Sequence, residues 1–257
     1  MSLANEIGMI RALWFRDLVH FVRAPTRLLG VVVQPTLMWL ILGTGLRSSV
    51  SIAGSRNYQT YFFPGILAMI ILFTAIFATI SLIEDRQVGF LKAVLVAPGS
   101  RLSLVLGKIS GVTTVVFVQV GLFLLLAPFA GYSLAKIAWG QFTLAVLLTT
   151  LLITSIGVIM AWKFDSVQSY HAIMSVVLVP MWIVSGAMFP VSGNWVDWII
   201  RINPMSYAVA ALRLSLDTDY ISKLWLGESM IFLLLTLCSI LALALATQAC
   251  QRSPNRM

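Results

Sequence analysis

Long apolar runs that contain almost no charge constrain this 257-residue chain most strongly. Residues 61–83 and 138–161 contain no Asp, Glu, Lys or Arg, and residues 105–130 contain only Lys108. A helix needs about 20 mostly apolar residues to cross a bilayer, so each of these runs is long enough. The chain is only 10% charged, whereas a soluble domain is about 25% charged. The sequence therefore predicts an all-α integral membrane protein.

Six transmembrane helices are expected, because residues 28–46, 171–189 and 229–249 are also uncharged and apolar. Gln34-Pro35 and Pro180 fall inside two of these spans, where neighbouring helices can satisfy the freed backbone groups. We expect one domain over residues 1–257, with the following parts. They are an interface helix (1–27), two spans (28–83), a cytoplasmic segment (84–101), three spans (102–189), an external segment (190–227), and a last span with the C-terminal tail (228–257).

The distribution of Lys and Arg predicts the orientation of the chain. With the N-terminus inside, the inner segments hold eleven of these residues and the outer segments hold six. Positive charge concentrates in cytoplasmic loops, so both termini and residues 84–101 are expected on the cytoplasmic side of the membrane. The membrane is expected to be a bacterial inner membrane. The net charge of +8 does not indicate nucleic-acid binding, since no basic stripe with interleaved aromatic residues is present.

Residues 3–21 have the spacing of an amphipathic helix. Apolar side chains follow each other at steps of three and four, while Arg11 and Arg16 lie off this stripe. The stripe consists of Leu3, Ile7, Ile10, Trp14, Leu18 and Phe21. Such a helix can lie in the cytoplasmic interface against membrane lipids. The alternative is an ordinary helix packed on the bundle.

The charged stretch at residues 83–98, IEDRQVGFLKAVLVAP, interrupts the apolar pattern. As a helix that starts at Glu84 and stops at Pro98, it would place acidic residues at its N-terminus, where the helix dipole favours them. Val88, Leu91 and Leu95 would form an apolar face toward the bundle. A polar face with Asp85, Gly89 and Lys92 would then point to the cytoplasm and could dock a partner. The alternative is a solvated loop with a capped turn.

Residues 186–213 read as two short helices with a break at Asn203-Pro204. Trp195, Trp198, Ile199 and Ile202 give the first of them an amphipathic pattern. On the outer side of the membrane this pair could form a shallow re-entrant hairpin, if protein or a water-filled cavity covers it. The alternative is a surface loop that is anchored by interfacial tryptophans.

The sequence offers no catalytic, metal or cofactor motif. Gly107-Lys108 misses the spacing of a phosphate-binding loop, and His20 and His171 lie far apart. The span centres hold Gln34 and Gln119, which are expected in helix packing or along a pathway. We expect no ion path of ionisable residues, and Lys108 is expected to reach toward the interface. The sequence therefore predicts a transport conduit driven by another subunit, and not an enzyme.

Two motifs resemble those of ABC-2 type transporter permeases, in the branch of multidrug and lipo-oligosaccharide exporters. The first is Glu84-Asp85-Arg86-x-x-Gly89-Phe90-Leu91-Lys92, followed by Leu95-x-Ala97-Pro98-x-x-Arg101. The second is Asn203-Pro204-Met205-Ser206-Tyr207 with Leu212-Arg213. Arg23, Arg27 and Gln34-Pro35 also resemble the family pattern, so the resemblance covers nearly the whole chain.

The resemblance implies a pair of permease chains, here expected as a homodimer, bound to two copies of a separate ABC ATPase subunit that holds ATP and Mg. It implies that a coupling helix between the second and third spans docks into the ATPase. The matching positions are Glu84, Asp85, Arg86, Gly89, Phe90, Lys92 and Arg101. It also implies an external re-entrant gate with Trp195, Trp198, Asn203, Pro204, Tyr207 and Arg213. The expected substrate is amphipathic: a drug, a glycolipid or a lipid-linked saccharide.

Other functional classes stay open on the sequence. A membrane-embedded enzyme or a stand-alone secondary transporter would need polar or ionisable residues that converge inside the spans. An ATP-driven importer or a channel-like scaffold would share the same apolar spans. An ATPase that purifies with the chain would favour the exporter.

Overall fold

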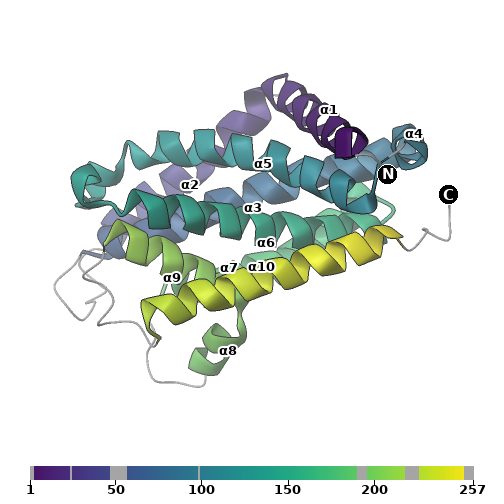
Figure 1. The fold of residues 1–257 in the computed structure, drawn as a ribbon. Helices are drawn as coiled ribbons and strands as arrows, with labels where there is room; N and C mark the ends of the chain where they lie inside the picture. The colour runs from purple at the N-terminus through teal and green to yellow at the C-terminus, as the bar shows by residue number, and fades with distance from the viewer. Residues whose placement is uncertain are drawn as a thin grey trace.

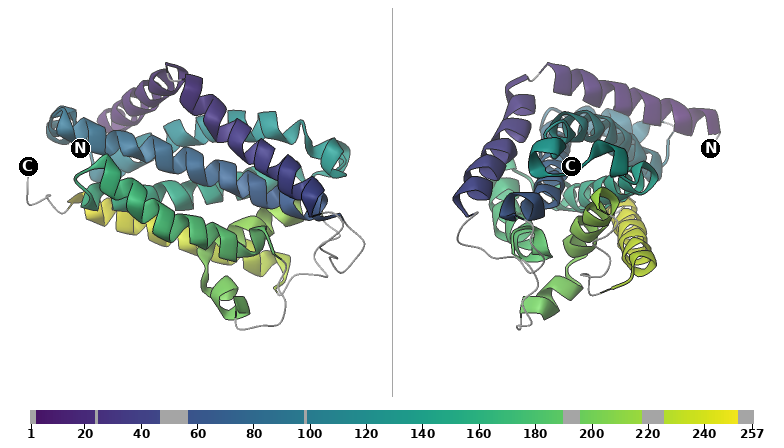
Figure 2. Two further views of the ribbon diagram at one scale, coloured as in Figure 1. Left: turned by 180° about the vertical axis from the view of Figure 1, so that it is seen from behind. Right: turned by 90° about the vertical axis from the view of Figure 1, so that its left-hand side faces the viewer.

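The computed structural model describes residues 3–23, 25–46, 57–97, 99–189, 196–217 and 226–251, and no strand occurs among them. Six long helices run side by side as a bundle (Figure 1). They are α2 (Pro25–Gly45), α3 (Tyr58–Gln87), α5 (Arg101–Leu124), α6 (Trp139–Lys163), α7 (Val167–Trp182) and α10 (Glu228–Gln251). The first helix, α1 (Leu3–Val22), lies across the bundle and meets α2 at an angle (Figure 2).

Helix α3 forms the core of the bundle. In its most apolar stretch 89% of the residues are buried, against 28% in α10, which lies at the periphery. A helix that is apolar on all sides has to be surrounded, and α3 contacts α2, α5, α6, α7 and α9. Trp39 of α2 packs edge-on against Phe63 of α3 and Phe123 of α5, with ring centroids 5.6 and 6.0 Å away.

Five helices are long and apolar enough to cross a membrane: α3, α5, α6, α10, and α7 together with the turn that follows it. The helix α2 has a shorter apolar stretch, Val32–Gly45. The predicted all-helical membrane protein is thus confirmed, and five of the six expected spans are supported by length and composition.

Short elements join the long helices at the two ends of the bundle. The helix α4 (Phe90–Val96) follows α3 at one end, where α1 begins and α10 ends (Figure 1). We call this the α4 end. At the other end, the 3-10 turns η1 (Ala127–Ala130) and η2 (Leu134–Lys136) connect α5 to α6. Thr60 Oγ1 of α3 donates to the Ala130 carbonyl over 2.7 Å, which fixes η1 to the core helix.

At this second end, which we call the α9 end, the chain leaves the bundle and then re-enters it. The helix α7 continues into η3 (Ile183–Ala187), a π-helical turn in which Gly186 has a φ of 79°. The short α8 (Val196–Ile202) projects from the bundle, and α9 (Pro204–Leu216) packs among α3, α6, α10 and η3 (Figure 1). Every residue from Met205 to Leu216 is buried, so the surface-loop alternative is wrong for α9.

Candidate functional site

The acidic pair at residues 84–85 lies at the end of α3 and not at the start of a separate helix. The helix α3 runs to Gln87, and α4 begins only at Phe90, after Gly89 takes a left-handed φ of 78°. The prediction of a helix from Glu84 is therefore wrong. The helix dipole disfavours acidic side chains at a C-terminus, so a cation beside Asp85 stabilises this end of α3.

Arg16 of α1 supplies that cation. Its Nη1 donates to Asp85 Oδ2 over 2.7 Å, and its Nη2 donates to Asp85 Oδ1. This hydrogen bond raises the pKa of the Arg16 guanidinium above its usual value. The same guanidinium lies 4.0 Å from the ring centre of Phe90 in α4. Asp85 is only 6% exposed, so the prediction that it lies on an exposed docking face is wrong.

Arg86 joins α3 to the end of α6. Its Nη2 donates to the carbonyls of Ala161 and Trp162 over 2.9 and 3.2 Å, and its Nη1 donates to that of Phe164 over 3.3 Å. The last carbonyls of a helix have no partner within the helix, and here Arg86 satisfies them. Its side chain is only 13% exposed. Arg86 thus stabilises the bundle from beneath the surface of the α4 end.

We predict that Arg86→Met lowers the stability of the folded chain. Each buried carbonyl that loses its partner costs about 1–3 kcal/mol. Lys163→Met is the matched control, because Lys163 is an exposed cation in the last turn of α6 and should change stability by about 0.5 kcal/mol or less. The measurement is the midpoint of thermal unfolding in detergent. Equal midpoints for both variants would show that Arg86 does not hold the end of α6.

The helix α4 and the residues that flank it turn apolar side chains outward. Val88 and Val96 are 77% and 86% exposed, and Ala93 and Ala97 are also exposed. We call these four residues the α4 patch. The prediction that Val88 faces the bundle is wrong, whereas Leu91 is buried as expected. Several exposed apolar side chains in one short segment make it a candidate contact site. The Lys92 side chain and Pro98 lie outside the described residues.

A groove of about 400 Å³ separates α4 from α1. Small residues line it on the α1 side, at Ala4, Gly8 and Ala12, and Phe90 and Val94 line it on the α4 side. Arg101, at the start of α5, donates from Nη1 to the Leu95 carbonyl over 3.4 Å and so holds the last turn of α4. The α4 end therefore offers an apolar patch with a groove beside it.

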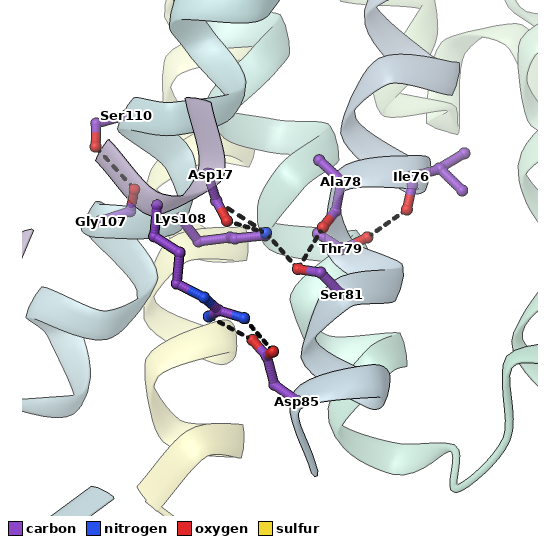
Figure 3. Close-up of polar contacts among 10 residues, drawn as sticks. Asp17, Ile76, Ala78, Thr79, Ser81, Asp85, Gly107, Lys108 and Ser110 are labelled. Atoms are coloured by element: carbon purple, nitrogen blue, oxygen red, sulfur yellow. Dashed lines mark hydrogen bonds and ion pairs between the residues drawn. The ribbon is translucent and has the colours of Figure 1, made fainter. Parts of the chain in front are cut away.

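A buried ion pair lies beneath this surface (Figure 3). Lys108 Nζ of α5 is 2.8 Å from Asp17 Oδ2 of α1 and donates to Ser81 Oγ of α3 over 2.7 Å. Lys108 and Asp17 are 5% and 9% exposed, so the prediction that Lys108 reaches the interface is wrong. The two cavities that touch the pair measure about 20 and 10 Å³, about the space of one water molecule.

The predicted apolar stripe of α1 is only partly the face that packs. Trp14 Nε1 donates to Thr114 Oγ1 of α5 over 3.0 Å, and Phe21 is buried, but Leu3 and Ile7 are 80% and 60% exposed. Helix α1 is therefore packed on the bundle through one part of its stripe. Asp17 lies three residues after Trp14 and four before Phe21, so the helical spacing also fits a buried stripe that passes through Asp17 instead of Leu18. Asp17 is the buried residue of the two.

Glycines let α1 approach α5 closely, which the sequence analysis missed. A Cβ on Gly107 would lie 2.9 Å from Leu13 Cβ, and a Cβ on Gly111 would lie 2.8 Å from Asp17 Cβ. The spacing Gly107-x-x-x-Gly111 is the small-residue pattern by which membrane helices pack backbone to backbone. That pattern was the available signal, and it places Lys108 beside the contact.

Glu6 fixes the start of α1 to the start of α5. Its Oε2 accepts from the Ser100 amide over 3.0 Å, from Ser100 Oγ over 2.7 Å, and from Ser103 Oγ. These hydrogen bonds, that of Ser103 first, lower the pKa of Glu6 from its usual value of 4.5. A carboxylate at a helix N-terminus is also favoured by the helix dipole.

This lowered pKa predicts a pH-dependent contribution to stability. It is present above pH 4.5 and disappears as the pH falls through the lowered pKa of the folded state, because the folded chain must then bind a proton. We expect Glu6→Gln to be less stable than the wild type at pH 7 and to approach it in acid. Thermal unfolding midpoints of both proteins between about pH 3 and pH 7 test this. A constant difference over that range would contradict it.

The second motif supplies three polar residues that bind backbone groups at the α9 end. Arg213 is 6% exposed and donates from Nη2 to the carbonyls of Tyr61 and Gly186 over 3.3 and 3.2 Å. Asn203 Oδ1 caps α9 by accepting from the Met205 amide over 2.9 Å, with Pro204 in the first turn. Tyr207 donates its hydroxyl to the Arg201 carbonyl. Trp198 is 69% exposed, and Trp195 lies outside the described residues.

The two glutamines predicted in the spans have different surroundings. The Gln119 side chain of α5 is buried and its Oε1 accepts a hydrogen bond from Thr74 of α3, which fits a role in helix packing. The Gln34 side chain is exposed on α2. An amide that faces hydrocarbon has no partner there, so this surface is a candidate for contact with a second chain or with substrate.

Comparison with known proteins supports this arrangement of motifs. A family model described as ABC-2 type transporter matches residues 9–216. The transport permease ycf38 of Cyanophora paradoxa is 28% identical over 84% of this chain and 76% of its own length, and that of Pyropia yezoensis is 30% identical over 82% and 74%. Nodulation protein J of Neorhizobium galegae is 23% identical over 79% of each chain. The chain therefore belongs to the ABC-2 type transporter family and is a membrane permease.

Proposed function

We propose that this chain is the transmembrane subunit of an ATP-driven exporter and that the α4 patch docks a separate ABC ATPase subunit. The family supports a permease that works with such an ATPase. The observation that carries the docking site is the exposure of Val88 and Val96 at one end of the bundle. Burial of apolar surface stabilises a complex by about 25 cal/mol for each Å² that is removed from water. A partner that covers this patch would therefore gain free energy of association.

Six passes and a cytoplasmic α4 end account best for the chain path. If α2 crosses the membrane once before α3, the chain makes six passes. The start of α1 and the end of α10 then lie at the same end of the bundle, as they do in Figure 1. Helix α2 is then the sixth span, although its apolar stretch is short. The greater number of Lys and Arg in the segments of this end favours the cytoplasm. We place the protein in a bacterial inner membrane.

Two copies of the chain would form the pathway between them, and we expect a homodimer. Helices α2 and α7 both contact the core helix α3, and they expose Gln34 and Ser175. Polar side chains in a span usually face protein or a water-filled cavity. A surface of apolar helices with a few such groups suits an amphipathic substrate: a drug, a glycolipid or a lipid-linked saccharide. The α8–α9 segment would close the pathway on the outside.

A stand-alone secondary transporter is less well supported. Ionisable residues inside the bundle are expected to mark an ion path, and Lys108 and Arg213 are both buried. Lys108, however, is neutralised by Asp17 beside cavities of only about 20 and 10 Å³. Arg213 donates to backbone carbonyls. These contacts indicate structural roles, so the energy for transport is assigned to the partner ATPase.

The docking site is tested by placing a charge in the α4 patch. We expect Val88→Asp and Val96→Asp to reduce the amount of ATPase subunit that purifies with the permease at least tenfold, a loss of about 1.4 kcal/mol or more. Gln168→Asp is the control, since Gln168 is an exposed residue at the start of α7. Size-exclusion elution of the permease checks folding. Full retention of the ATPase by both valine variants would contradict this docking site.

A further inference from the structure

Three helices meet at a single buried lysine. Lys108 of α5 contacts Asp17 of α1 and Ser81 of α3, at 2.8 and 2.7 Å (Figure 3). The next residue of α1, Arg16, is paired with Asp85 at the end of the same α3. Helix α1 is thus joined by charge to the core helix and to α5.

Helix α1 packs closely on α5 at two glycines. Asp17 lies over Gly111 and Leu13 lies over Gly107, where added Cβ atoms would come within 2.8 and 2.9 Å. A movement of α1 along α5 would leave Lys108 or Asp17 buried without its partner, which is strongly unfavourable.

Helix α4 is tied to the same three helices. It follows α3 after Gly89, which has a φ of 78°. The Arg16 guanidinium of α1 lies 4.0 Å from the ring centre of Phe90 in α4, and Arg101 of α5 donates to the Leu95 carbonyl. A push on α4 can therefore reach α1, α3 and α5.

We propose that Asp17 and Lys108 are positioning residues that make α1, α3 and α5 move as one body, so that force from an ATPase bound at the α4 patch reaches the spans. This rests on the proposed function, since it needs a partner that acts on the α4 end. The ion pair holds the register in a way that an apolar contact does not, because an apolar contact tolerates sliding. Asp17→Leu with Lys108→Met therefore keeps the fold and loses the register.

The experiment uses spin labels on the whole complex of permease and ATPase, with Cys238 and Cys250 replaced. Arg11→Cys and Gly121→Cys in one chain report the distance between α1 and α5, and Gly121→Cys alone reports the distance between the α5 helices of two copies. Both positions are exposed. Electron-resonance distances are measured without nucleotide and with Mg²⁺ and a non-hydrolysable ATP analogue.

In the wild type we expect a constant distance within the chain and a nucleotide-driven shift between the copies. The Asp17→Leu, Lys108→Met variant should retain its bound ATPase. Its distribution of α1–α5 distances should broaden, and the nucleotide-driven shift between the α5 helices of the two copies should fall by at least half. The exchanged pair Asp17→Lys, Lys108→Asp should restore both, and Ser110→Ala, which removes only a bond within α5, should change neither. Wild-type behaviour of the apolar variant would overturn the inference. A wild type without bound ATPase or nucleotide-driven shift would instead contradict the proposed function.

Discussion

Replacement of Gly65 by leucine is expected to prevent the accumulation of folded protein. A Cβ at this position of α3 would lie 2.7 Å from the Ala187 carbonyl oxygen and 2.9 Å from the Ala187 Cβ. Both are parts of η3 that cannot rotate away, and Trp182 Nε1 also donates to the Gly65 carbonyl over 2.8 Å. Overpacking of a core typically costs about 1–3 kcal/mol, and a backbone contact has less room to relax than most.

The matched control is Gly121→Leu in α5, where an added Cβ meets nothing within 4 Å. Both variants add the same side chain to the interior of a long helix. The yield of monodisperse protein in detergent, compared at equal expression, is the measurement. We expect a near-normal yield for Gly121→Leu and an intermediate yield for Gly65→Ala. A normal yield for Gly65→Leu would show that α3 and η3 do not pack at this distance.

Loss of Arg213 is expected to release the α9 end. Arg213→Met removes a guanidinium whose Nη2 donates to the carbonyls of Tyr61 and Gly186 and which lies 4.1 Å from the Tyr61 ring centre. A hydrogen bond from a charged group contributes about 1.5–3 kcal/mol. We therefore expect a large fall in the unfolding midpoint. We also expect faster proteolysis around η3, because it loses one of its links to α3, beside the Tyr61 hydroxyl bond to Gly186 and the Trp182 bond to Gly65.

Two further variants define the role of Arg213. Arg213→Lys keeps the charge but lacks the planar guanidinium that lies over Tyr61, so it should recover only part of the stability. Arg11→Met removes an exposed arginine from α1 and should leave the unfolding midpoint close to that of the wild type. If Arg213→Met and Arg11→Met unfold alike, Arg213 does not hold η3 and α9 together.

The helices of the bundle could be predicted because apolar length is a local property. Runs such as 61–83 and 138–161 are buried in lipid or protein whatever their neighbours are, and they appear as α3 and α6. The break at Asn203-Pro204 is equally local: Asn203 accepts the Met205 amide and Pro204 begins α9, as predicted. The proline fixes its own φ, so distant residues are not required.

The environment of the charged residues could not be predicted in the same way. Asp85 was expected on an exposed face, but its partner Arg16 lies 69 residues earlier in the chain. Arg86 finds its carbonyls at the end of α6, 75 residues later at Ala161. Helical periodicity places a side chain on a face, but it does not say which helix lies opposite that face.

The sequence by itself determined that this chain is a helical membrane protein, and its motifs indicated an ABC-2 type permease. Hydrophobicity and turn chemistry act within a few residues, so both can be read along the chain. Only the tertiary structure decided that Asp17 and Lys108 form a buried pair, that Arg86 caps α6, and that Val88 and Val96 are exposed on either side of Phe90. A charge is tolerated inside the bundle only where another helix brings its partner within a few ångströms, and that is a property of the packed fold.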